Sequence, residues 1–300
     1  MRRNIPSSRA LVAFEAAGRH ESFTLAAQEI NLTEGAVSRQ IGRLETSLGV
    51  KLFARVKNRV HLTTNGRIYW EQICSDIERL ERHTLNLQAH PGDGGILELA
   101  VIPTFNARWL IPRLHDFTDK SQGIKINMTE LTEPFIFANS SIDAALHYDH
   151  PAWVGMFKVD LFAEELVPVC SPRLCGGSPL VDLNELKKFP LLHHRGRLRS
   201  WQNLSVQLEL KSFNPMAGTR YALFLTIIEA ARAGLGIGLV PKLYVTDELA
   251  RGELIIPFDS QSFSEKRYCL IYPERMHESP PLNTFVSWLK NAAHVYKDES

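Results

Sequence analysis

Residues 22–66 have the sequence SFTLAAQEINLTEGAVSRQIGRLETSLGVKLFARVKNRVHLTTNG, and this stretch decides the fold of the N-terminal part. Thr33 can cap a helix, and Gly49 can end it. Between them, apolar side chains recur at the spacing of one buried helical face: Val37, Ile41, Leu44 and Leu48. The pattern predicts a helix with one face in a core.

The opposite face of this helix is small and polar, with Glu34, Gly35, Ser38, Arg39, Gly42 and Arg43. A shorter helix, capped by Thr24 and running through Ile30, precedes it after a tight turn. Two short helices of this kind are typical of a helix-turn-helix, whose second helix enters the major groove of DNA. Arginine can bond the O6 and N7 edge of guanine with both arms. The alternative is a helical bundle whose charged face meets only solvent.

Residues 50–63 predict two short strands around a basic turn that carries Arg55, Lys57 and Arg59. A basic hairpin beside a DNA-reading helix, known as a wing, contacts phosphates, which fix affinity and register without reading sequence.

A long helix is predicted over residues 66–88, followed by a Gly-rich linker at residues 90–95. Its apolar positions alternate in steps of three and four: Trp70, Ile73, Ile77, Leu80, Thr84 and Leu87. This a/d spacing favours a dimerisation helix, and a helix packed on its own chain is the alternative. A dimer would present two reading helices to a pseudo-palindromic site.

Composition and charge fit this division. The chain has 300 residues, enough for about two domains. Residues 1–70 hold eleven basic and five acidic side chains, whereas the rest has a net charge of −5. A basic module joined to a mildly acidic one is a nucleic-acid signature. Four cysteines without a C-x-x-C pair, and no signal peptide, favour a cytoplasmic protein without a zinc cluster.

Residues 22–66 resemble the DNA-binding head of LysR-type transcriptional regulators, through A-V-S-R-Q-I, L-E-x-x-L-G, L-F-x-R and L-T-x-x-G. The resemblance continues along the chain, most closely to the subgroup with the glycine-cleavage and β-lactamase regulators. It implies a winged helix-turn-helix, a linker-helix homodimer, and usually a homotetramer. The expected partner is promoter DNA, and such a regulator could also contact RNA polymerase. It places Glu34, Gly35, Ser38, Arg39 and Gln40 at base edges or nearby phosphates. Many members have Gln or Ser at positions 34 and 35. The complete predicted interface is Thr33, Glu34, Gly35, Ser38, Arg39, Gln40, Arg43, Arg55, Lys57 and Arg59.

Residues beyond the linker alternate strand-like and helix-like segments, which predicts two mostly parallel sheets covered by helices. The resemblance implies a two-lobed α/β effector domain similar to periplasmic binding proteins, with a cleft for a small molecule. The predicted divisions are a winged helix-turn-helix domain at 1–65, a linker helix at 66–92 and an effector domain at 93–300. Lobe one would comprise 93–167 and 267–300, and lobe two 168–266.

Thr104 is the leading candidate for effector contact, because it would cap a helix over residues 105–118 where amides can hold an anion. The resemblance also places these residues on segments facing the cleft: Thr132, His147, Tyr148, His193, Tyr221 and Phe224. For each of them the alternative is ordinary packing. Ala222-Leu223 stands where the family often has a polar pair, which indicates a more apolar effector.

No motif of a metal site, cofactor or catalytic nucleophile is recognisable, so the chain is predicted not to be an enzyme and to need no cofactor. The sequence from Gly234 to Gly238, GLGIG, follows a helix and precedes a strand, the reverse of a dinucleotide-binding turn. The alternative to a regulator is a two-lobed binding protein or enzyme with a helical oligomerisation arm.

Overall fold

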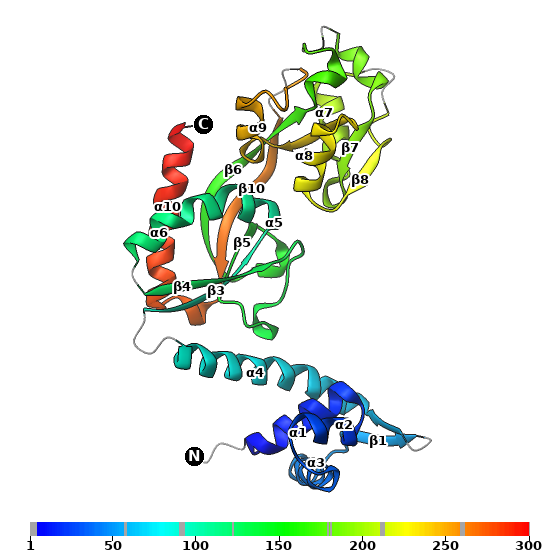
Figure 1. Cartoon of the computed structure of the whole chain (residues 1–300), viewed down its shortest axis with the longest axis vertical. Helices are drawn as coiled ribbons and strands as arrows, with labels where there is room; N and C mark the ends of the chain where they lie inside the picture. The colour runs from blue at the N-terminus through cyan, green and yellow to red at the C-terminus, as the bar shows by residue number, and fades with distance from the viewer. Residues whose placement is uncertain are drawn as a thin grey trace. The chain divides into compact units, whose positions relative to one another are not determined.

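The computed structural model describes residues 5–56, 59–89, 94–121, 123–178, 180, 182–210, 214–258 and 262–299. The chain divides into two compact units, Met1–Gly92 with Phe137–Ser141, and Asp93–Ile136 with Ile142–Ser300 (Figure 1). Among the described residues, no helix is both long and apolar enough to cross a bilayer.

The first unit is a winged helix-turn-helix followed by a long helix, as predicted. Its elements are α1 (Ser8–His20), α2 (Phe23–Glu29), α3 (Glu34–Leu48), β1 (Phe53–Val56), β2 (Arg59–Leu62) and α4 (Thr64–Ala89). The strands β1 and β2 pair antiparallel and form the wing.

The ends of α3 are confirmed, whereas the predicted start of α2 is wrong. The Thr33 hydroxyl accepts a bond from Ala36 N, and Gly49 ends the helix in the left-handed conformation at φ 71°. Helix α2 is capped by Ser22, not Thr24, because it begins one residue before Thr24. The Thr24 hydroxyl therefore lies in the first turn and is available for another bond.

The core of the first unit is built mainly from alanines on α1 and α2, which let the helices approach closely. Val37 and Ile41 of α3 pack against them, and Leu44 packs with Phe14. Leu48 is exposed, against prediction. The chain reverses at Gly49, and Leu52, which is only 1% exposed, fills this core in its place.

The apolar face of helix α4 is partly buried in its first half and exposed in its second half. Trp70 and Ile73 pack on the first unit's own core. The Trp70 indole N–H donates to the Glu15 carbonyl at 2.9 Å, and a Cβ at Gly18 would lie 2.2 Å from that indole. Further along, Leu80 and Leu87 are 63% and 71% exposed. The first half of the predicted dimerisation face thus packs within the chain, whereas its second half is exposed and stays a prediction.

The second unit is a mixed α/β fold around one eight-stranded sheet of order β4-β3-β5-β10-β6-β9-β7-β8. The strands are β3 (Gly95–Val101), β4 (Ile124–Glu130), β5 (Ala144–Tyr148), β6 (Phe157–Val169), β7 (Leu191–His194), β8 (Thr219–Tyr221), β9 (Ile237–Pro241) and β10 (Ser262–Tyr272).

Two separate sheets were expected, and this is wrong. The long strands β6 and β10 pair antiparallel with each other and belong to both halves of the sheet (Figure 1). Strands β4, β3 and β5 run parallel on one side, and β9, β7 and β8 on the other. The two α/β halves are therefore joined by continuous backbone hydrogen bonding.

Helices cover this sheet: α5 (Pro103–Phe105), α6 (Leu114–Lys120), α7 (Ser200–Gln207), α8 (Phe224–Arg232), α9 (Thr246–Ala250) and α10 (Pro280–Glu299). The expected helix over residues 105–118 is interrupted by a π-helical turn, Asn106–Leu110, and a 3₁₀ turn, Ile111–Arg113. Thr104 is not a cap, because Pro103 already starts α5 and Ile102 takes the cap position.

Candidate functional site

The outer face of α3 forms one continuous exposed surface. Thr33, Glu34, Gly35, Ser38, Arg39 and Arg43 are exposed, and Gln40 is half-buried. The glycines on this face are not required by packing, since a Cβ built at Gly35 or Gly42 meets nothing within 4 Å. Gly42 also makes helix α3 less stable by about 1 kcal/mol than an alanine at the same position would. Because glycine has no side chain, a partner's surface can approach the α3 backbone closely at these two positions.

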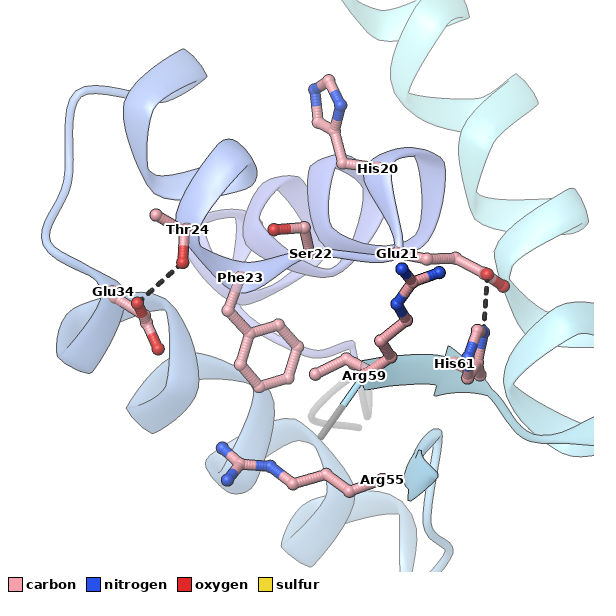
Figure 2. A pocket seen from close by; sticks show the side chains of 10 residues that line it. His20, Glu21, Ser22, Phe23, Thr24, Glu34, Arg55, Arg59 and His61 are labelled. Atoms are coloured by element: carbon pink, nitrogen blue, oxygen red, sulfur yellow. Dashed lines mark hydrogen bonds and ion pairs between the residues drawn. The ribbon is translucent and has the colours of Figure 1, made fainter. Parts of the chain in front are cut away.

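The wing continues this surface. Arg55 on β1 and Arg59 on β2 line a hollow together with Glu34, at the start of α3, and residues 20–24 (Figure 2). The Glu34 carboxylate accepts a bond from the Thr24 hydroxyl at 2.8 Å, which ties the start of α3 to α2. Lys57, also predicted for this interface, lies outside the described residues. The structure thus brings the two described wing arginines to the same side as the first turn of α3.

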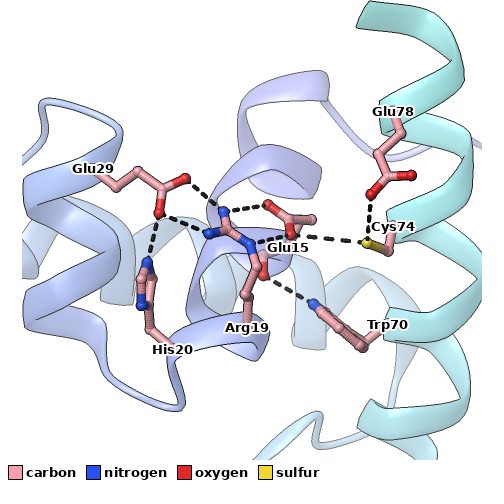
Figure 3. Close-up of polar contacts among 7 residues, drawn as sticks. All are labelled: Glu15, Arg19, His20, Glu29, Trp70, Cys74 and Glu78. Carbon is pink, nitrogen blue, oxygen red and sulfur yellow. Dashed lines mark hydrogen bonds and ion pairs between the residues drawn. The ribbon is translucent and has the colours of Figure 1, made fainter.

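A polar network that sequence reasoning missed holds α1 against α2 (Figure 3). Arg19 bonds Glu15 at 2.9 Å and Glu29 at 2.5 Å, and the His20 ring lies 2.5 Å from Glu29. Arg19 and His20 lower the pKa of the Glu29 carboxyl to about 2. These ion pairs fix the orientation of α2, and α2 in turn supports α3.

In the second unit, Thr104 joins the two halves of the sheet. Its side-chain oxygen accepts a hydrogen bond from the backbone N–H of Leu225, in the first turn of α8, at 3.2 Å. Thr104 is only 2% exposed. The hydroxyl is therefore part of a buried contact between α5 and α8.

A second buried contact is the Glu164 cluster, defined as Glu164, Arg197, Tyr148, Tyr244 and Tyr268. Glu164 accepts hydrogen bonds from the Tyr148 hydroxyl at 2.8 Å and the Tyr268 hydroxyl at 3.1 Å. Its other oxygen accepts a bond from Arg197. The Tyr244 hydroxyl lies 2.7 Å from that of Tyr268. Burial raises the pKa of all three phenols, so they remain neutral.

Aromatic rings enclose the Arg197 guanidinium. Its centre lies 4.5 Å from the Tyr148 ring and 5.0 Å from the Phe224 ring. The His194 ring stacks on Phe224 with centroids 4.4 Å apart. Burial, and then the charge of Arg197, lower the pKa of His194 to about 4, so this ring is neutral near pH 7.

The structure brings three of the predicted effector residues together, since Thr104, Tyr148 and Phe224 lie in or beside the Glu164 cluster. His147 is next to it, with its ring nitrogens 3.1 Å from the Tyr148 carbonyl and 3.3 Å from the Thr132 carbonyl.

Two other predicted residues, His193 and Tyr221, make different contacts. The His193 ring lies 2.8 Å from the Ala217 carbonyl, and His193 points to the opposite side of β7 from His194. Tyr221 is half-buried against the main core.

Sequence reasoning missed Glu164 and Arg197. In the structure Glu164 lies between Phe162 and Leu166 on one side of β6, but this alternation would have indicated Glu164 only if a strand had been predicted before Leu166. Arg197 gave no signal, since it follows β7 in a short 3₁₀ turn among other basic residues.

Two further observations concern metal binding and the reactivity of the cysteine thiols. Within the described parts of the chain, no three His, Cys, Asp or Glu side chains gather in a way that could hold a metal ion. The Sγ atoms of Cys170 and Cys175 lie 3.4 Å apart, and burial raises the pKa of the Cys170 thiol, which makes it a poor nucleophile.

Known proteins resemble this chain along nearly its whole length. A family model described as "Bacterial regulatory helix-turn-helix protein, lysR family" matches residues 8–67, and one described as "LysR substrate binding domain" matches residues 90–294. The glycine cleavage system transcriptional activator of Escherichia coli K12 is 34% identical over 290 residues, which cover 96% of this chain and 94% of that protein.

Solved structures show the same folds. The effector domain of the regulator AmpR from Pseudomonas aeruginosa is 25% identical, covers 67% of this chain and 96% of its own, and has a TM-score of 0.59. Full-length CbnR, solved in complex with its target DNA, has a TM-score of 0.69 at 20% identity and covers 95% of this chain and 99% of its own.

Proposed function

The chain belongs to the LysR family of DNA-binding transcriptional regulators, and on that premise we propose which of its surfaces bind DNA and the effector. The DNA-binding surface is the outer face of α3 with the wing arginines, residues 33–35, 38–40, 43, 55, 57 and 59. The observation that carries this assignment is the exposed row of Ser38, Arg39 and Arg43 beside glycines that no neighbour requires. Arg39 contacts a guanine edge, and Arg55 and Arg59 contact phosphates.

Arg39→Ala tests this surface. It is expected to weaken binding to the DNA upstream of the chain's own coding region by about 1–3 kcal/mol and to relax base preference at one position. Gel shifts across a salt series and a set of single-base operator variants measure both effects. Arg39→Lys is the matched control, since it keeps the charge but loses the two-armed fork. If affinity instead falls equally for all operator variants and depends less steeply on salt concentration, Arg39 contacts a phosphate rather than a base.

The glycines give a second test. Gly42→Ala is expected to raise the free energy of unfolding by up to about 1 kcal/mol. Gly35→Ala, at the N-terminal end of α3 where base contacts concentrate, is expected to lower operator affinity at least about tenfold with no loss of stability. Thermal unfolding and gel shifts on both variants check this. Equal operator affinities for Gly35→Ala and the unaltered chain would rule out close approach at Gly35.

The effector-binding site proposed here lies between the two halves of the second unit's sheet. We assign residues 93–167 with 267–300 to lobe one and 168–266 to lobe two. This is supported by the pairing of β5 with β10 at Tyr268–Ile271 and of β9 with β6 at Leu166–Val169. The proposal is also supported by two contacts between the halves, Thr104 with Leu225 and Tyr148 with Arg197, which a movement of the lobes would change. An effector shifts such an equilibrium only by its different affinity for the two states.

Thr104→Val is expected to abolish the effector response while operator affinity survives. Valine has the same shape but cannot accept the bond from Leu225 N–H. A reporter fused to the chain's own promoter measures the response, and gel shifts measure affinity. Thr118→Val is the control, because its hydroxyl is exposed and bonds only within α6. Unchanged induction in Thr104→Val would remove Thr104 from the site.

Assembly and location belong to the same proposal. The exposed Leu80 and Leu87 on α4 support a homodimer through this helix, with residues 66–92 as the linker segment. Two such dimers would make the homotetramer that the resemblance implies, and the cytoplasm and contact with RNA polymerase follow from a promoter-bound regulator.

A further inference from the structure

The first residue of α3 places an acidic side chain on a face that is otherwise basic. Glu34 is exposed, and the exposed Arg39 and Arg43 follow it on the same face of the helix. A carboxylate repels the phosphates of DNA, so it lowers affinity unless the DNA offers it a hydrogen-bond donor. In the major groove the donors are the N4 amino group of cytosine and the N6 amino group of adenine. Glu34 is therefore suited to a base edge and not to the backbone.

Thr24 holds the Glu34 carboxylate in one orientation. Its hydroxyl, in the first turn of α2, donates to Oε2 of Glu34 at 2.8 Å (Figure 2). Among the described residues, no hydrogen bond or ion pair reaches the other carboxylate oxygen, although Arg55 and Arg59 line the same hollow. One oxygen thus fixes the side chain and the other is available as an acceptor. A side chain that is already ordered loses less conformational entropy when it binds.

The surroundings of Glu34 allow a base pair to come close. Gly35, the next residue, is exposed and has no side chain, and a Cβ built there meets nothing within 4 Å. Ser38, one turn further along the same face, carries only a small hydroxyl group. Recognition helices contact base edges mainly through their N-terminal residues. Glu34 therefore lies at the part of α3 from which a side chain reaches a base.

The two bases that offer an amino group differ in what stands beside it. Adenine presents its N7 acceptor next to the N6 amino group, so a carboxylate that approaches N6 also meets the lone pair of N7. Cytosine presents the N4 amino group and no acceptor of its own. A carboxylate, which only accepts, therefore fits cytosine. A carboxamide of the same shape both donates and accepts, and fits the N6 and N7 edge of adenine.

We propose that Glu34 selects a cytosine in the operator by accepting a hydrogen bond from its N4 amino group, and that Thr24 is the positioning residue for this contact. The inference rests on the proposed DNA-binding function of the α3 face, and goes beyond it by naming the base that one side chain selects. Thr24 acts through Glu34 and contacts no base itself.

Selection from a pool of randomised DNA duplexes tests the proposal, because it reports the base preference of the full chain at every position without a known operator. The unaltered chain is expected to select cytosine at one position where Glu34→Gln selects adenine, with the other positions unchanged. Glu71→Gln is the matched control, since it removes the same charge from an exposed side chain on α4. This control is expected to leave every base preference as it is.

A modified base tests the hydrogen bond itself. N4-methylcytosine carries a methyl group in place of the N–H that faces the major groove, and it keeps the pair with guanine. At the selected position it is expected to weaken binding of the unaltered chain about tenfold, as the loss of one base contact does, and to leave Glu34→Ala unaffected. Gel shifts measure both affinities, and thermal unfolding confirms that the variants are folded.

The role of Thr24 has its own variants. Thr24→Val keeps the shape of the side chain but cannot donate to Glu34, so it is expected to reduce the preference for cytosine at this position about threefold. Thr24→Ser retains the hydroxyl and is expected to retain the preference. A reduced preference at every position, or an equal preference in the valine and serine variants, would show that Thr24 does not position Glu34.

Two results would overturn the selection of cytosine: the same base preference in Glu34→Gln and the unaltered chain, or an equal effect of N4-methylcytosine on Glu34→Ala and the unaltered chain. An equal rise in the affinity of Glu34→Gln for every duplex would mean that Glu34 only repels phosphates. In each of these cases the chain still selects a sequence, so the proposed function stands. If the unaltered chain enriches no sequence, the proposed function itself fails.

Discussion

Glu164→Leu is expected to destabilise the second unit by about 3–5 kcal/mol, because it leaves Arg197 as an unpaired buried charge. Glu164 is fully buried and accepts bonds from Arg197, Tyr148 and Tyr268, so three donors lose their acceptor at once. Leucine fills similar space, which keeps the cavity contribution small. The loss therefore reflects unsatisfied polar groups.

Urea unfolding followed by tryptophan fluorescence measures this loss, since four of the five tryptophans, 109, 153, 201 and 288, belong to the second unit. The double variant Glu164→Leu with Arg197→Met is the decisive comparison. It removes both charges and is expected to recover most of the stability, since apolar replacements of a buried ion pair are often neutral. If the double variant is as unstable as the single one, the charge of Arg197 is not the cause.

Glu45→Ala is expected to destabilise the first unit by about 2–4 kcal/mol, because a buried carboxylate there satisfies several donors. Glu45 lies in the last turns of α3 and its side chain is 10% exposed. One oxygen accepts bonds from the backbone N–H groups of Leu52 at 2.9 Å and Phe53 at 3.2 Å, and the other from Lys51 at 2.6 Å. Loss of Glu45 frees the start of the wing from α3, so operator affinity should fall with stability.

The same carboxylate gives the first unit an acid-sensitive component of stability. Burial works to raise the pKa of Glu45, but the bonds from Lys51, Leu52 and Phe53 outweigh it, and the net shift is downward. A carboxyl whose pKa is lowered on folding stabilises the fold above its ordinary value, about 4.3, and loses that contribution as pH falls through the lower folded value.

Hydrogen exchange of the peptide containing Leu52 and Phe53 reports the opening free energy at this junction. Glu45→Gln is the matched control, since it keeps an acceptor for both N–H groups but cannot titrate. The Glu45→Gln variant should lose less protection from hydrogen exchange than Glu45→Ala. Its opening free energy should also lack the acid-dependent contribution that Glu45 makes. Equal protection in Glu45→Ala and the unaltered chain would show that these bonds contribute nothing.

Much of the first unit could be predicted because its signals are local. The stripe of Val37, Ile41 and Leu44, the cap at Thr33 and the stop at Gly49 are set by neighbours in the sequence. The predictions for the first unit were wrong where a residue from a distant segment fills a core position that the local pattern assigned to another residue, or packs on a face expected to be free. Leu52 replaced Leu48 in the core, and the packing of Trp70 on Gly18 took the first half of the α4 face.

The second unit was predicted as strands and helices but not as one sheet. Short apolar runs in the sequence indicate strands, but they do not predict which strands pair with each other in a sheet. The region of β6 before Leu166 contains exposed charged residues and gave no strand signal, although it pairs with β10 and carries Glu164.

The sequence by itself determined the helix-turn-helix, its exposed basic face and the family, because short-range periodicity and a long motif specify them. Only the tertiary structure decided that Glu164, Arg197 and three tyrosines from separate strands and turns meet in one buried cluster with an unsatisfied guanidinium arm. Residues up to 120 positions apart make these bonds, and pairing over such separations depends on the folded sheet rather than on any local pattern.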